Sequence, residues 1–139
     1  IRRPPRSTLD RSSAASDVYK RQIIIKGLEA LLQECVIAAD RYGVADIVLD
    51  SISSNHPEID WKSLTDYYLG RSVLHGIRRG REMEEVADTL RCLNIEPLMA
   101  EATAKRIQWL AKHELIHYFD GKQPKTYRNI LNTLDRQNS

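Results

Sequence analysis

Apolar residues return every three or four positions along most of this chain, and this spacing constrains the fold more than any other feature. Between Ile24 and Tyr42 the recurring residues are Leu28, Leu31, Leu32, Cys35, Ala38 and Ala39. No segment shows the strict apolar–polar alternation that is typical of a half-buried strand. The sequence therefore predicts an all-α domain, a compact bundle of about five to six helices.

Capping and breaking residues divide the first half of this pattern into helices. Gly43 is placed to end the helix that starts near Ile24, because glycine readily adopts the left-handed conformation at a helix C-terminus. Residues 44–53 fit either a short helix or a strand. Asp60 can cap the next helix with its side chain, and we expect Gly80 to end that helix.

The second half of the chain contains three further helical segments. Met83, Val86, Ala87 and Leu90 form a helical stripe of apolar residues. Pro97 suits the first turn of a helix, and the pattern that follows predicts a long helix that continues to about Phe119. After the break at Asp120 and Gly121, residues 124–134 predict a last short helix.

Length and composition exclude several classes of protein. The chain has 139 residues and is 42% hydrophobic, which suits a single domain and is too apolar for wholesale disorder. No run of about 18 uncharged apolar residues exists, so we expect no membrane span. Cys35 and Cys92 are too few for a disulfide scaffold, and two reduced thiols favour a cytoplasmic location.

Residues 1–22 resemble the in-frame translation of a transposase-type sequencing adapter. The match runs codon by codon from Ser12 to Gln22, and residues 1–8 read back as the flow-cell primer of such an adapter. A native basic, disordered tail is the alternative, because the segment is rich in arginine, proline and serine. We expect residues 23–139 to be the single helical domain, without its native N-terminus.

Setting this segment aside changes the charge of the protein. Residues 1–22 hold six basic and two acidic residues, so the +2 net charge of the whole chain becomes −2 for residues 23–139. Residues 23–70 are acidic, whereas residues 71–112 hold eight basic and six acidic side chains. What remains is therefore not a basic protein drawn to polyanions, although a mildly basic second half survives.

Residues 73–107 resemble a LuxR-type helix-turn-helix. Val73 to Ala87 match its first two helices, and Leu93 to Pro97 match its turn, although Leu90–Cys92 insert three residues before that turn. The resemblance implies DNA-binding transcriptional regulation, with the helix after Pro97 in the major groove. Lys105, Arg106 and Lys112 would then contact phosphates or base edges.

Residues 110–119 resemble the HExxH motif of zinc metallopeptidases. On a helix, His113 and His117 would lie one turn apart and bind zinc, while Glu114 would act as the general base. A third ligand is required, and the available donors are Asp135, Asp120, His75 and His56. The alternative is a pair of histidines at the edge of a packing helix.

Three functions thus follow from the sequence. The first is a small helical regulatory domain that binds DNA and needs no cofactor. The second is a compact zinc-dependent metallopeptidase. The third is a helical protein-interaction module without catalytic activity, whose partner would contact Trp109 and Leu98, because both point away from the Ile107 face of their helix.

Overall fold

The computed structural model describes the backbone of residues 6–139 and the side chains of residues 20–139, and it confirms the all-α prediction. Five α-helices and one 3-10 helix follow one another: α1 (Arg6–Asp40), α2 (Ala45–Asn55), α3 (Trp61–Cys92), α4 (Leu98–Ala111), η1 (Leu115–Phe119) and α5 (Tyr127–Gln137). Residues 6–139 contain no strand. Within the described part of the chain, no helix is long and apolar enough to cross a membrane.

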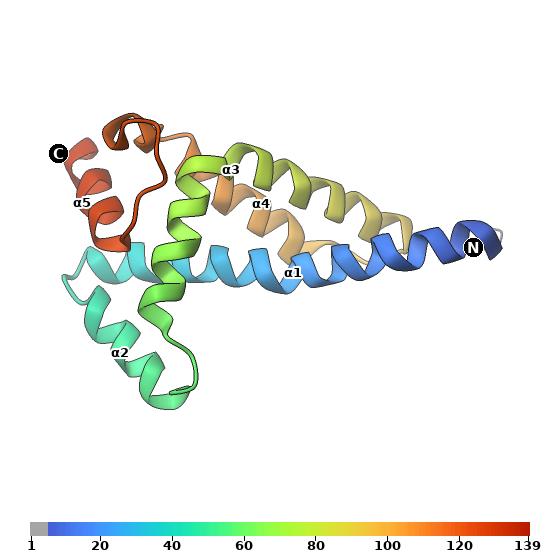
Figure 1. Cartoon of the computed structure of the whole chain (residues 1–139), viewed down its shortest axis with the longest axis horizontal. Helices are drawn as coiled ribbons and strands as arrows, with labels where there is room; N and C mark the ends of the chain where they lie inside the picture. The colour runs from blue at the N-terminus through green and yellow to red at the C-terminus, as the bar shows by residue number, and fades with distance from the viewer. Residues whose placement is uncertain (1–5) are drawn as a thin grey trace.

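The helices form two groups along the length of α1 (Figure 1). The second half of α3 and the whole of α4 run antiparallel to each other beside α1. The first half of α3 crosses α1 near its C-terminal end, where α2, η1 and α5 also gather. Helices α3 and α4 contact each other more extensively than any other two elements do, so their hairpin is the main packing unit of the bundle.

Helix α1 begins earlier than the sequence predicts. Residues 6–22, which we assigned to a tail outside the domain, are helical and continuous with the rest of α1. Residues 1–5 lie outside the described residues. The C-terminal end agrees with the prediction, because the helix stops at Asp40 and Gly43 follows with a φ angle of +71°. Of residues 44–53, which fit either a short helix or a strand in the sequence, Val44 is the N-cap of α2 and the others belong to that helix.

Helix α3 does not end at Gly80, and the prediction of a break there is wrong. The helix begins as predicted, with the Asp60 side chain accepting a hydrogen bond from the Ser63 backbone N–H at 3.1 Å, but it continues to Cys92. At Gly80 a Cβ atom would lie 2.3 Å from the Gln108 side chain of α4. This glycine therefore allows α3 and α4 to approach closely, and it does not end a helix.

Helix α4 ends at Ala111, eight residues before the predicted end at Phe119. The reason is the burial of Leu115, which is 1% exposed in the same core as Leu110. On a continuous helix these two side chains would point about 140° apart, at 100° per residue. The chain therefore leaves the helix after Ala111 and turns before η1, which brings Leu115 inward.

Two hydrophobic clusters and a polar band between them hold α1, α3 and α4 together. The larger cluster includes Leu32, Leu49, Leu69, Leu110, Leu115 and Ile130, and the smaller one consists of Met83, Val86, Ala87, Ala100 and Ala104. Between them lie the buried polar residues Lys26, Glu29, Gln33, Ser72, Arg79 and Thr103. Arg79 pairs with Glu29, and Lys26 pairs with Glu82.

Candidate anion-binding site

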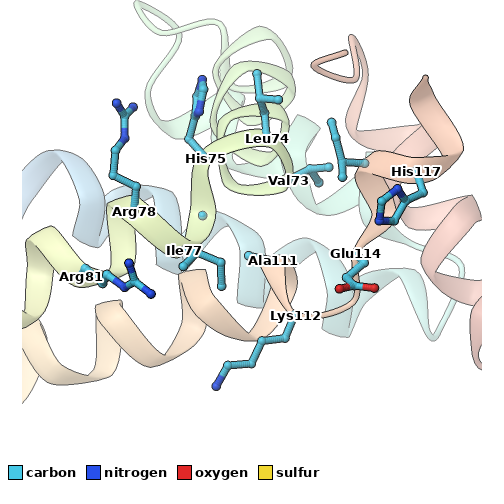
Figure 2. Close-up of a pocket in the computed structure, with 12 residues that line it drawn as sticks. Val73, Leu74, His75, Ile77, Arg78, Arg81, Ala111, Lys112, Glu114 and His117 are labelled. Carbon is cyan, nitrogen blue, oxygen red and sulfur yellow. The ribbon is translucent and has the colours of Figure 1, made fainter. Parts of the chain in front are cut away.

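A cavity of about 620 Å³ lies between the middle of α3 and the segment that follows α4 (Figure 2). Its apolar walls are Val73, Leu74, Ile77, Ala111 and Ile116, with Gly76 among them. Its charged and polar lining is Arg78, Arg81, Lys112, Glu114, His75 and His117. The cavity therefore combines three permanent cations with one carboxylate and two imidazoles.

The spacing of residues on α3 supplies one side of the cavity. His75, Arg78 and Arg81 follow each other at intervals of three, which places them along one face of the helix. Arg79 lies about 100° away from Arg78 and points into the protein, where it pairs with the buried Glu29. Arg78 thus lines the cavity, whereas its neighbour Arg79 points into the interior of the bundle.

The break after α4 supplies the other side. Lys112 follows the last helical residue, and Glu114 has a left-handed backbone conformation with φ 54° and ψ 35°. The His117 N–H donates to the Glu114 carbonyl at 3.3 Å, so Glu114 and His117 lie on one short turn. The Gln137 side chain of α5 donates to the His113 carbonyl at 2.7 Å and so ties this turn to α5.

Close packing of the two helices sets the floor of the cavity. A Cβ atom on Gly76 would lie 2.6 Å from the Cβ atom of Ala111 and 3.1 Å from the Ile107 carbonyl oxygen. The backbones can approach this closely because neither residue carries a large side chain. The charged residues on either side of this contact are thereby brought into one cavity.

The positive charge of the cavity is only weakly neutralised. Arg78 approaches Glu82 at 3.9 Å, but Glu82 also pairs with Lys26. Among the side chains that the structure describes, Arg81, Lys112 and Glu114 form no ion pair within 4 Å. At neutral pH three cations therefore face a cavity that contains a single carboxylate.

The titration of His75 reflects this positive environment. Burial of its imidazole lowers the pKa of His75, and the charges of Arg71, Arg78 and Arg79 lower it further. Nearby cations disfavour a protonated imidazole, so His75 is kept neutral. An anion that enters the cavity would oppose this effect.

The structure places the HExxH residues in a turn and a 3-10 helix rather than on an α-helix. His113 is one residue before the left-handed Glu114, and its Nδ1 atom lies 2.8 Å from the Trp109 carbonyl oxygen. Of the proposed third ligands, His75 lines the same cavity as His117. No group of three or more potential metal ligands occurs among the described residues. Zinc binding by His113 and His117 stays a prediction.

The predicted DNA-contacting residues lie along α4 and at its C-terminal end, in different surroundings. Arg106 donates to Glu34 of α1 at 2.9 Å and stacks on the Trp109 ring at 5.1 Å. Lys105 is exposed on α4, whereas Lys112 lines the cavity. Helix α4 packs against both α1 and α3, and with α3 it forms a long antiparallel hairpin. DNA binding through these three residues stays a prediction.

The two residues predicted to contact a protein partner differ in their surroundings. Trp109 is partly buried against the larger hydrophobic cluster and lies beside the His113 ring, with 4.4 Å between ring centroids. Leu98 is 64% exposed at the tip of the α3–α4 hairpin. Leu93, Ile95 and Met99 are also exposed there. A partner surface that includes both Trp109 and Leu98 stays a prediction.

Sequence reasoning missed Arg78 and Arg81 as candidate site residues. The signal that could have indicated them is their spacing, since they continue a polar face that His75 begins. It also missed the buried pair of Glu29 and Arg79. There the signal was a carboxylate within the apolar arc of Ile25 and Leu32.

Comparisons with known proteins place this fold in a known group. The family model described as "Domain of unknown function (DUF1932)" matches residues 39–110, a little over half of the chain. A crystal structure of a conserved hypothetical protein from Sinorhizobium meliloti 1021 is similar over 85% of this chain, with a TM-score of 0.78 and 34% sequence identity. This chain spans 39% of the length of that protein. No curated protein matches the chain.

Proposed function

This chain belongs to the DUF1932 family, and we propose that it is a helical binding domain whose cavity between α3 and η1 holds a small anionic ligand. The observation that carries the proposal is that Arg78, Arg81 and Lys112 all line one cavity of about 620 Å³. Arg78 and Arg81 belong to α3, whereas Lys112 follows the end of α4, and the protein itself neutralises their charge only weakly.

The number and type of the cations favour a phosphate group over a carboxylate. An arginine guanidinium presents a planar set of N–H donors that matches phosphate or carboxylate oxygens, and a lysine adds a point charge. One carboxylate carries a single negative charge and would leave most of the three positive charges unneutralised. A phosphate monoester is close to dianionic at neutral pH and would neutralise more of them. A ligand with a phosphate group therefore complements the cavity best.

Titration with inorganic phosphate, followed by NMR of the histidine ring protons, tests the proposal. We expect saturable shifts of the His75 and His117 signals, with an affinity that weakens as salt is added. The double variant Arg81→Met/Lys112→Met should lose these shifts. As a matched control, Lys122→Met removes an exposed cation outside the cavity and should leave the titration unchanged.

The proposal would be overturned by phosphate shifts that never saturate, or by equal shifts in the Arg81→Met/Lys112→Met variant. Thermal melting of each variant shows whether the fold is intact. We expect both variants to melt close to the unsubstituted chain, because Arg81, Lys112 and Lys122 are exposed.

A further inference from the structure

Glu114 is the one acidic side chain in the lining of the cavity, and the cations there do not neutralise it. Figure 2 shows Glu114 beside His117 at one end of the cavity, while Arg78 and Arg81 lie at the opposite end. Lys112 also lines the cavity, and Figure 2 shows its side chain directed away from Glu114. Among the described side chains, no lysine or arginine nitrogen lies within 4 Å of the Glu114 carboxylate. The cavity therefore has a positively charged end and a negatively charged end.

The backbone at this position does not explain the choice of glutamate. Asn94, Glu114 and Asp120 are the non-glycine residues with positive φ among those described. Asparagine and aspartate adopt this conformation several times more often than other side chains, whereas a glutamate there is uncommon. A glutamate in a left-handed turn, exposed and without an ion-pair partner, adds nothing to the fold that asparagine or glycine would not provide.

From this arrangement we infer that the ligand carries an amine as well as its phosphate, with the ammonium group on Glu114 and the phosphate on Arg78, Arg81 and Lys112. The inference rests on the proposed function. A carboxylate in a phosphate site repels the ligand unless the ligand also presents a positive charge to it. An ammonium group supplies that charge and donates hydrogen bonds to the carboxylate.

Two probes that differ in the amine alone test this inference. Phosphoethanolamine carries a phosphate and an ammonium group, and ethyl phosphate carries the same phosphate on an uncharged chain. Isothermal titration calorimetry should show that the protein binds phosphoethanolamine about 1.4- to 5-fold more tightly, the range expected for one solvent-exposed ion pair. Glu114→Gln should abolish the preference and leave the affinity for ethyl phosphate equal or higher.

Two controls separate the inference from changes in folding. Glu114→Asn removes the same charge with a residue that tolerates the left-handed backbone, so it should behave as Glu114→Gln does. Glu58→Gln removes an exposed carboxylate outside the cavity and should keep the preference. Thermal melting of all three variants verifies the fold.

The outcomes distinguish the inference from the proposal on which it rests. If neither probe binds, the phosphate site itself is wrong. If both bind with equal affinity, or if Glu114→Gln keeps the preference for phosphoethanolamine, the phosphate site stands and the amine-bearing ligand is refuted. A preference that depends on Glu114 supports both.

Discussion

Single glycines decide how closely α3 and α4 approach. At Gly76 a Cβ atom would overlap Ala111 of α4, whereas at Gly27 of α1 it would meet nothing closer than the Thr103 Oγ1 atom at 3.8 Å. Both glycines lie inside helices, so their backbone preferences are the same. The effect of adding one methyl group at each position therefore isolates the packing between α3 and α4.

We expect Gly76→Ala to lower the free energy of unfolding by about 1–3 kcal/mol, because the added methyl group forces the helices apart. Gly27→Ala should raise it by about 0.5–1 kcal/mol, since alanine loses less backbone entropy in a helix than glycine does. Urea denaturation of both variants measures the difference. A Gly76→Ala variant as stable as Gly27→Ala would contradict the close contact.

The buried pair of Glu29 and Arg79 joins two elements, α1 and α3. Glu29 is fully buried and accepts hydrogen bonds from the Ser72 hydroxyl at 2.5 Å and from Arg79 Nε at 3.3 Å. The pair connects the two helices between the larger and the smaller hydrophobic cluster. Removing Arg79 alone leaves the Glu29 carboxylate in the interior without its counter-charge.

We expect Arg79→Met to lower the free energy of unfolding by about 3–5 kcal/mol, the usual cost of leaving one member of a buried ion pair alone. Arg78→Met changes the neighbouring exposed arginine of the same helix and should alter stability by less than about 0.5 kcal/mol. The double variant Glu29→Met/Arg79→Met should recover most of the loss. Chemical denaturation of the three variants checks these values, and a small effect of Arg79→Met would refute the buried pair.

Helix α5 meets the end of α1 at two polar contacts. One is an ion pair, and the other brings two carboxyl groups together. Arg128 of α5 donates to Asp40 at 2.7 Å. A hydrogen bond with Asp40 raises the pKa of Asp135, and burial and the negative charge of Asp40 raise it further. Because its pKa is raised in the folded state, ionised Asp135 destabilises that state at neutral pH.

Asp135→Asn should therefore stabilise the protein near neutral pH. The gain should decrease as the pH falls through the folded pKa, and it should vanish below the ordinary carboxyl pKa of about 3.9, where the aspartate is protonated in both states. Thermal melting at several pH values measures this profile. A destabilised Asp135→Asn variant at neutral pH would show that the two carboxyls do not oppose each other.

At the scale of the whole molecule, the buried residues that the structure describes in α1 all follow residue 22. The buried residues among the described side chains begin at Lys26, and Ile23 is partly buried against the smaller cluster. The core residues that the structure describes therefore lie within residues 23–139.

Deleting residues 1–22 should leave the melting temperature unchanged within about 2 °C, because every buried residue that the structure describes lies after this segment. Deleting residues 1–32 is the contrasting variant, because it also removes Lys26, Glu29 and Leu32 from the interior, and it should abolish cooperative unfolding. Circular dichroism melts of the three chains compare them. A fall of several degrees on removing residues 1–22 would show that this segment packs against the domain.

The sequence alone determined the helical class and several helix ends. Asp60 and Gly43 act as predicted, because a cap side chain and a left-handed glycine satisfy backbone groups within their own turn. These are local properties, so three or four neighbouring residues are enough to indicate them.

Only the tertiary structure decided where α3 and α4 end and which charges meet. Gly80 lies inside α3 because Gln108 packs over it, and α4 ends at Ala111 because Leu115 is buried beside Leu110. The cavity with Arg81 and Glu114, and the buried pair of Glu29 and Arg79, each unite residues more than 30 positions apart. Such contacts depend on how helices pack against one another, a property that no local spacing contains.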